Sequence, residues 1–261
     1  MKLKCLTWCF ALFGVVFFIL IFYASKISPN QPSLLENIFL TFSSCFISLF
    51  ISVFVIQGLL DKRNENQAKE KERALILRHQ KVYDRLFSKY ILTLHWCTNP
   101  LNDLIHSKIP VESITYFPIK KLQFIYSPTG LIYAPMGEYA VTAWFNAESE
   151  LRDFIVKEIC SIDFKYYPVI GNLFIDFVNI SITNDVKETI LQYKRNGIYD
   201  KLKEVIEEAL LDESRNLLKE RDEGKLRGTI FLPFANLYAL MLGQLQVIGK
   251  IHTEIEKLKK E

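Results

Sequence analysis

The side chains closest together in sequence that could support acid–base or metal chemistry are His95, Asp103 and His106, with Cys97 nearby. On a bent helical segment, a histidine oriented by a carboxylate can act as a general base, and these residue types can also hold a metal ion. Their spacing matches no catalytic or zinc-binding motif. We interpret them as surface and half-buried polar residues, with catalysis or metal binding as the alternative.

Other signatures of chemistry do not occur in the sequence. We find no glycine-rich phosphate loop, no nucleophile motif, no catalytic pair of carboxylates and no metal-ligand cluster. The five cysteines are too scattered for a disulfide framework or a zinc motif, which predicts free thiols. We therefore expect no cofactor and no enzymatic activity, and the alternative is an enzyme whose site does not form a compact motif.

Aromatic residues in a proline-rich and glycine-rich stretch are the best candidates for a partner contact. Residues 108–141 are interrupted by prolines and glycines, which predicts a long irregular connection with one turn of helix or a small hairpin. An exposed aromatic side chain there can anchor a protein interface or stack on a nucleobase. The candidates are Tyr116, Phe117, Tyr126 and Tyr133. The alternative is that they belong to the core, as we expect for most other aromatic residues.

A second set of candidates lies on one side of a predicted helix at residues 37–60. Small and hydroxyl side chains recur there at three- and four-residue steps, and a stripe of phenylalanines occupies the opposite side. The small residues are Thr41, Ser44, Ser48 and Ser52, joined by Cys45. Such spacing allows helices to approach closely in a membrane. This face either packs against an earlier apolar run of the same chain or brings several copies together around a polar centre.

The small and hydroxyl residues lie in the second of two long apolar runs, residues 5–25 and 37–60. Neither run contains a charged side chain. Each run is about as long as a helix that crosses a bilayer. The sequence predicts a transmembrane hairpin in residues 1–60, with spans at about 6–23 and 38–60. A cleaved signal peptide is the alternative, but the first run exceeds the usual length of an h-region and a second run follows it directly.

The charges around the two runs predict the orientation of the hairpin. Lys2 and Lys4 precede the first run, and Lys62 and Arg63 follow the second, whereas the short connection carries few charges. The positive-inside rule then places both termini in the cytoplasm, which corresponds to a multi-pass membrane protein. Because neither run contains a charged residue that could relay protons, form an ion-pair gate or sense voltage, active transport is not expected.

The remainder of the chain is expected to be a mostly helical cytosolic domain, residues 81–261, that follows a charged juxtamembrane helix at 61–80. The first helix should end before Pro100 because proline disfavours a helical residue in front of it. The periodicity predicts further helices from Asn146 to about Ser161, after Pro168, from Asn184 to Asn196, and over 198–221. Residues 228–249 are either a core helix or a third span. The fold class is mainly α with one irregular segment.

This layout of two spans, a charged helix and a helical body resembles the two-transmembrane effector proteins of bacterial retron anti-phage systems. The resemblance is one of architecture, so no functional residue is carried over from the family. The resemblance implies a toxin that damages the bacterial inner membrane and is kept inactive by a retron reverse transcriptase bound to its multicopy single-stranded DNA. The expected partners are thus the lipid bilayer, further copies of the chain and that complex. The alternative function is a membrane-tethered binding, scaffold or sensor protein without toxic activity.

Overall fold

The computed structural model describes residues 16, 19, 22–23, 32–99, 116–128 and 138–260. The described part is mainly helical, as the sequence predicts, and its only β pairing is an isolated antiparallel bridge between Pro128 and Tyr139. The chain divides into two compact units, Met1–Glu70 and Lys71–Glu261. This division falls within residues 61–80. The predicted first span, residues 6–23, lies mostly outside the described residues.

Helix α2 runs from Pro32 to Thr98 and carries the second apolar run. It ends two positions before Pro100, as the sequence predicts, because proline disfavours the α conformation in the residue before it. Two helices are long and apolar enough to cross a membrane, Ser44–Thr98 within α2 and Leu232–Lys260. In the most apolar 18-residue stretch of Ser44–Thr98 the buried share is 0%, whereas in the corresponding stretch of Leu232–Lys260 it is 56%.

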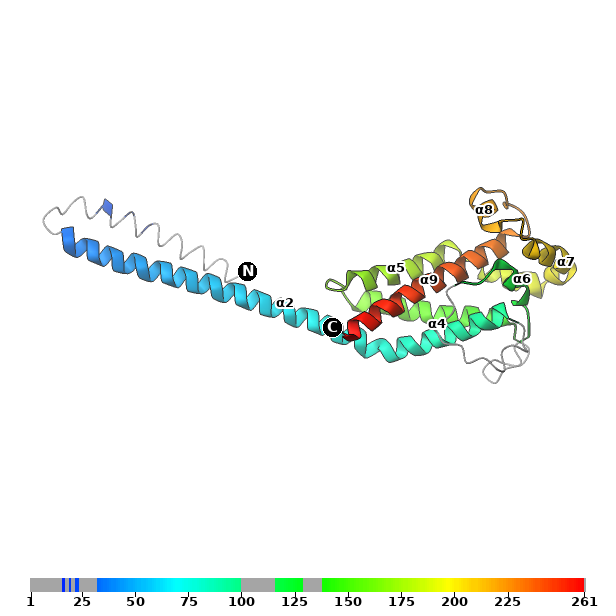
Figure 1. Ribbon diagram of the computed structural model, residues 1–261, viewed down its shortest axis with the longest axis horizontal. Coiled ribbons are helices and arrows are strands. Elements are labelled where there is room, and N and C mark those ends of the chain that lie inside the picture. Colours follow the sequence, from blue (N-terminus) through cyan, green and yellow to red (C-terminus); the bar gives the residue numbers. More distant parts are fainter. Residues whose placement is uncertain are drawn as a thin grey trace. The chain divides into compact units, whose positions relative to one another are not determined.

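The second unit contains the end of α2 and all the later elements: η2 (Ile119–Phe124), α4 (Ala140–Ser161), α5 (Pro168–Thr183), α6 (Lys187–Arg195), α7 (Ile198–Leu211), α8 (Leu217–Asp222) and α9 (Leu232–Lys260). In Figure 1 the end of α2 lies alongside α4, α5 and α9, which together surround the core. Tyr90 of α2 is fully buried there, with its ring 5.8 Å from that of Trp144 and 6.4 Å from that of Phe177.

Helix α9 is a core helix of this unit. Its buried residues include Phe234, Met241 and Ile248, and the polar side of its apolar segment, for example Gln246, is exposed. The sequence leaves two alternatives for residues 228–249, and the burial of this face corresponds to the core-helix alternative. An amphipathic pattern with one buried face is what a helix at the side of a bundle requires.

Two helix boundaries differ from the sequence prediction, each for a local reason. Helix α4 begins at Ala140 rather than at Asn146, because the backbone N–H groups of Ala140 and Val141 donate to the carbonyls of Ser127 and Ile125, so no side-chain cap is needed. The predicted helix over 198–221 is broken after Leu211. There the carboxylate of Asp212 accepts hydrogen bonds from the backbone N–H and hydroxyl of Ser214, a turn that competes with the helix.

The connection between α4 and α5 depends on a close approach of two residues. Phe164 has a positive φ of 51° and a buried side chain, and its ring packs edge-on against Phe174. A Cβ added to Gly171 would lie 2.8 Å from the Cβ of Phe164. Only glycine at position 171 therefore allows this connection to close against the first turns of α5.

Candidate functional site

The first candidate site is a set of contacts near Lys71, where α2 enters the second unit. These contacts hold α2 against the other helices of that unit. We name this set the α2 clamp and define it as Glu72, Arg73 and His79 with their partners. The side chain of Glu72 is 8% exposed, and its carboxylate accepts hydrogen bonds from the backbone N–H groups of Tyr166 and Tyr167, each at 3.1 Å. These groups precede Pro168, the first residue of α5. A carboxylate is stabilised there because the first N–H groups of a helix lack intrahelical acceptors and carry partial positive charge.

Arg73 makes the complementary contact at the opposite end of another helix. Its Nε and Nη2 donate to the carbonyl of Leu258 at 3.2 and 3.1 Å, in the last turn of α9. A guanidinium is favoured at this position because the last carbonyls of a helix carry partial negative charge. Adjacent residues of α2 thus bind a helix N-terminus and a helix C-terminus.

The third contact of the α2 clamp joins an imidazole to a carboxylate, one to two turns further along the helix. His79 Nδ1 lies 2.9 Å from a carboxylate oxygen of Glu158, whose side chain is only 8% exposed, in the final turn of α4. The three contacts join α2 to α4, α5 and α9. The start of this part of α2 is therefore held in the second unit by polar contacts as well as by apolar packing.

A buried polar network lies deeper in the same unit and ties the four helices together. Gln244 of α9 donates from Nε2 to Glu148 Oε1 at 2.9 Å and to Ser181 Oγ at 2.7 Å, and its Oε1 accepts from the Tyr90 hydroxyl at 3.0 Å. Ser181 Oγ also lies 2.9 Å from Glu148 Oε1. Burial and the nearby charge of Glu148 raise the pKa of Tyr90 well above its ordinary value. We interpret this network as structural, because each polar side chain in it is satisfied by another.

A helix that began at Asn146, as the sequence predicts, would have Glu148 in its first turn, whereas α4 begins at Ala140. The side chain of Glu148 is buried, because α4 begins a turn and a half earlier and the position falls on the core face. The spacing of residues in the sequence could have predicted that Glu148 is buried. It lies in one helical stripe, at three- and four-residue steps, with Trp144, Leu151 and Ile155. A charged residue within such a stripe indicates a buried network.

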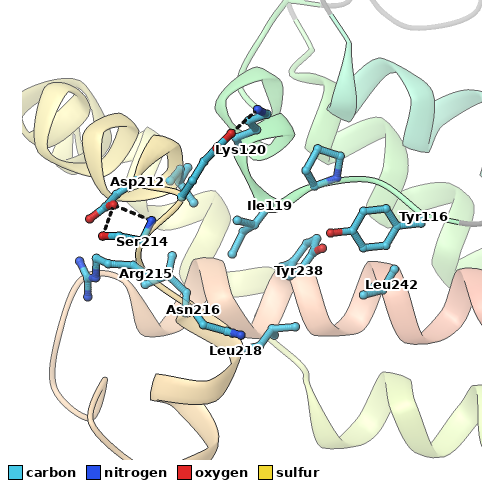
Figure 2. Close-up of a pocket in the computed structure, with 14 residues that line it drawn as sticks. Tyr116, Ile119, Lys120, Asp212, Ser214, Arg215, Asn216, Leu218, Tyr238 and Leu242 are labelled. Atoms are coloured by element: carbon cyan, nitrogen blue, oxygen red, sulfur yellow. Dashed lines mark hydrogen bonds and ion pairs between the residues drawn. The ribbon is translucent and has the colours of Figure 1, made fainter.

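The second candidate site is a pocket of about 410 Å³ between η2, the turn after α7 and α9, which we name the Tyr116 pocket (Figure 2). Apolar side chains of Ile119, Leu218 and Leu242 contribute to its lining. At its rim, Lys120 forms an ion pair with Glu213 at 2.9 Å. The pocket therefore combines an apolar lining with paired charges, a composition suited to a small polar ligand or to a peptide side chain.

Two tyrosines line this pocket, and their hydroxyl groups point toward each other in Figure 2. Tyr238 is buried and donates to the carbonyl of Phe117 at 2.8 Å, whereas the side chain of Tyr116 is 65% exposed. Burial, together with the hydroxyl of Tyr116, raises the pKa of Tyr238 above its ordinary value. Tyr116 is thus an exposed aromatic side chain beside a pocket, as a partner contact requires.

The other three aromatic candidates are not available on the described surface. Phe117 and Tyr126 are 5% and 6% exposed, so these two belong to the core instead of a contact surface. The hydroxyl of Tyr126 donates to the carbonyl of Ile190 at 2.7 Å. Tyr133 lies outside the described residues. Proline and glycine content predicts irregular backbone but says nothing about which aromatic side chain the neighbouring helices cover.

Three tyrosines, two of them from described parts of the irregular stretch, surround Lys194 of α6. The ammonium of Lys194 lies 5.5 Å from the ring centres of Tyr139 and Tyr199 and 6.0 Å from that of Tyr126. Lys194 also forms an ion pair with Asp200. Cation–π contacts of this kind join the residues on both sides of 129–137 to α6 and α7.

The candidate acid–base residues are only partly placed by the structure. Asp103 and His106 lie outside the described residues. His95 Nδ1 is 2.8 Å from the side-chain amide of Asn99, and burial raises the pKa of the Cys97 thiol. Among the described residues, no group of three or more His, Cys, Asp or Glu side chains could hold a metal ion.

The hydroxyl residues of α2 share one face of the helix. Thr41, Ser44, Ser48 and Ser52 are all exposed. At about 100° per residue, the half-buried Phe46, Val53 and Gln57 lie on the opposite side of the helix. Partial burial in this stretch therefore falls on the phenylalanine side.

No protein-family model, no curated protein and no solved structure matches this chain at a significant level. We therefore infer function from the chain's own residues and layout.

Proposed function

We propose that this protein is a membrane-embedded effector of an anti-phage defence system, which damages the bacterial inner membrane after partner proteins release or activate it. Residues 6–23 and 38–60 form a transmembrane hairpin, with both termini and the helical body in the cytoplasm. The defence role follows from the resemblance in layout to retron effectors. The partner that holds the effector inactive is then a retron reverse transcriptase with its multicopy single-stranded DNA. The protein acts without catalysis and without a cofactor.

The observation that carries the membrane part of the proposal is the contrast within α2. Large apolar side chains between Ile47 and Leu60 are exposed. In the most apolar 18-residue stretch of this helix, the buried share is 0%. Further along the same helix, Glu72, Arg73 and His79 bind three other helices. An apolar surface of this extent is stable only against lipid or protein. The α2 clamp then couples the body to the spans.

Damage to the membrane requires several copies, because two helices cannot enclose a column of water. The exposed Thr41, Ser44, Ser48 and Ser52 supply a face for self-association, since small hydroxyl side chains permit close helix contacts in lipid. A partner that favours the dispersed state keeps the protein inactive by its differential affinity for the two states. Loss of that partner shifts the population toward clusters.

Substitution of one serine tests this proposal. Ser48→Leu should abolish growth arrest and depolarisation of the membrane after induced expression, because the larger side chain keeps the helices apart, while insertion is retained. Phe50→Leu on the opposite, exposed side is the matched control and should remain toxic. Fractionation and a carboxyl-terminal reporter fusion verify insertion and orientation for both. An undiminished growth defect with Ser48→Leu would contradict the proposal.

The Tyr116 pocket favours a second candidate, a membrane-tethered binding or sensor protein. Here the spans only hold the body at the membrane, and the exposed Tyr116 beside a cavity of about 410 Å³ recruits a soluble partner. Expression of the unaltered chain then leaves the membrane potential unchanged. Tyr116→Ala would abolish recruitment of that partner, whereas it would leave depolarisation by an unrestrained effector intact.

A further inference from the structure

The Tyr116 pocket combines an apolar lining with a charged rim, and the rim determines which partner the pocket can accept. In the lining, Leu210 and Leu217 are buried, and Ile119, Leu218 and Leu242 are half-buried. The volume of about 410 Å³ lies within the range of ligand pockets, about 300–1,000 Å³. This size suits the side chains of a peptide rather than a whole helix.

Both basic residues of the rim are already paired with acidic residues. Lys120 Nζ lies 2.9 Å from Glu213 Oε1. Arg215 donates from Nε and Nη2 to the two carboxylate oxygens of Glu220, at 3.2 and 2.6 Å. Its guanidinium also lies 5.2 Å from the ring centre of Phe231, and in Figure 2 it points away from the two tyrosines of the pocket. Each base of the rim therefore has a carboxylate partner within the chain.

Acidic residues outnumber basic ones on the α7 side of the rim. Residues 204–213 contain no basic residue and five acidic ones: Glu204, Glu207, Glu208, Asp212 and Glu213. Lys203 lies 3.8 Å from Glu207, and two hydrogen bonds from Ser214 lower the pKa of Asp212, which lines the pocket. The carbonyl groups at the end of α7 add partial negative charge, and the last turn of this helix contains no basic residue. This side of the rim therefore favours a cation.

We propose that the Tyr116 pocket binds a peptide segment of a partner protein, in which a large apolar residue is adjacent to a lysine or an arginine. The apolar side chain packs against Tyr116 and enters the lining, and the cationic side chain binds at the acidic rim. This inference rests on the proposed function in one respect, namely that a soluble partner contacts the body of the protein. It assigns this contact to the protein component of that partner.

The exposure of the rim makes it accessible to such a peptide. The side chain of Glu213 is 81% exposed, and an exposed ion pair such as that with Lys120 is weak, so a second cation can replace Lys120 there. The ring of Tyr116 is exposed beside the apolar lining, where it can cover the apolar residue of the peptide. A peptide that has both kinds of side chain uses the lining and the rim together.

The same charges disfavour a nucleic acid at this site. An exposed aromatic ring such as that of Tyr116 can stack on a nucleobase, but the affinity of proteins for nucleic acids comes largely from basic residues that neutralise phosphates. Lys120 and Arg215 are each paired with a carboxylate, and the neighbouring end of α7 is acidic. Phosphate groups would therefore be repelled, whereas a basic peptide would be attracted.

Binding of synthetic peptides to the full chain in nanodiscs of a zwitterionic lipid tests the inference. The probe is a fluorescent, terminally blocked peptide, Gly-Ser-Arg-Leu-Leu-Arg-Ser-Gly, and the control peptide has glutamate at both arginine positions. Empty nanodiscs give the background. We expect the arginine peptide to bind about tenfold more tightly than the control, and added salt to weaken its binding. Equal affinities, or tighter binding of the glutamate peptide or of a single-stranded oligonucleotide, would overturn the inference.

Changes to the two charges of the rim should alter this affinity in opposite directions. Glu213→Lys removes the partner of the incoming cation and should weaken binding of the arginine peptide by about tenfold. Lys120→Gln removes the competing cation and should strengthen binding by about two- to threefold. Asp153→Lys, at an exposed position of α4 that does not line the pocket, is the matched control. Weaker binding after Lys120→Gln would indicate an anionic ligand and would contradict the inference.

Substitution of the exposed tyrosine tests the apolar half of the contact. Tyr116→Ala should weaken binding of the arginine peptide by about tenfold, because the apolar residue of the peptide loses the ring that covers it. Tyr116→Phe retains the ring and should bind the peptide as the unaltered chain does. Unchanged affinity in Tyr116→Ala would show that the peptide binds elsewhere.

Further readouts separate this inference from the proposed function. If the peptide binds but induced expression leaves the membrane potential unchanged, the pocket assignment is correct and the effector role is wrong. If depolarisation occurs and the arginine peptide does not bind, the effector role is correct and the pocket assignment is wrong. If Glu213→Lys lowers the mass of the protein particles in detergent, a second copy of the chain occupies the pocket, which would also overturn the inference.

Discussion

The carboxylate of Glu72 accepts a hydrogen bond from the backbone N–H of Tyr167, 95 residues later in the chain, at 3.1 Å. This contact places a negative charge at the N-terminus of α5 and attaches α2 to it. The next residue, Arg73, binds the C-terminal turn of α9. Glu72 and Arg73 thus interact with the positive end of one helix dipole and the negative end of another. The attachment of α2 to the body is therefore electrostatic as well as apolar.

Removal of the Glu72 carboxylate should weaken this attachment. Glu72→Ala is expected to lower the free energy of unfolding by about 1–2 kcal/mol, because part-buried N–H groups at a helix start lose their acceptor. Glu72→Gln should cost less, since an amide oxygen can still accept. Chemical denaturation of the full-length protein in detergent measures the effect. Glu65→Ala, an exposed position of α2, is the control, and an equal loss there would contradict the role of Glu72.

Gly171 should tolerate no side chain. Gly171→Ala places a Cβ 2.8 Å from the Cβ of Phe164, so the connection that presents the N–H groups to Glu72 must move. We expect a loss of roughly 1–3 kcal/mol in unfolding free energy. Gly249→Ala is the matched control in α9, where an added Cβ meets no atom within 4 Å, and it should stabilise by about 0.4–1 kcal/mol. If both variants have the same sign, the close approach is not the cause.

Two buried tyrosines should respond differently to loss of their hydroxyl groups. The Tyr83 hydroxyl is buried without a hydrogen-bond partner among the described residues, whereas the Tyr90 hydroxyl donates to Gln244 Oε1 at 3.0 Å. Tyr83→Phe should therefore be neutral or stabilising by up to about 1 kcal/mol, and Tyr90→Phe should destabilise by about 1–2 kcal/mol. Thermal unfolding followed by circular dichroism compares the two. Equal costs would indicate that the network around Gln244 contributes nothing specific.

The thiols of Cys97 and Cys160 should differ in reactivity and pH dependence. Cys97 is buried and its pKa is raised by burial, whereas Cys160 is exposed. At pH 8 we expect a maleimide to label Cys160 rapidly and Cys97 only on unfolding. Because the folded-state pKa of Cys97 lies above the unfolded value of about 8.5, its stabilising contribution is complete below that pH and is lost as pH rises through the folded-state pKa. Rapid labelling of Cys97 in the folded protein would contradict its burial.

Local sequence patterns anticipated several boundaries of the fold. Pro100 indicated the end of α2, Pro168 the start of α5, and Asn196 with Gly197 the end of α6, where Gly197 adopts a φ of 66°. These signals act through the backbone of neighbouring residues, so they can be read without knowledge of the rest of the chain. The start of α4 was missed because backbone carbonyls of another segment, Ser127 and Ile125, replace the expected cap.

The sequence by itself determined that the chain is mainly helical and that one stretch of α2 is apolar and uncharged throughout, because both follow from composition and periodicity within a window of residues. Only the tertiary structure decided that Tyr116 is exposed while Phe117 and Tyr126 are covered, and that Glu72 caps α5. Each of these depends on which segments pack together. That choice is made by contacts between residues far apart in the chain, and no local pattern encodes it.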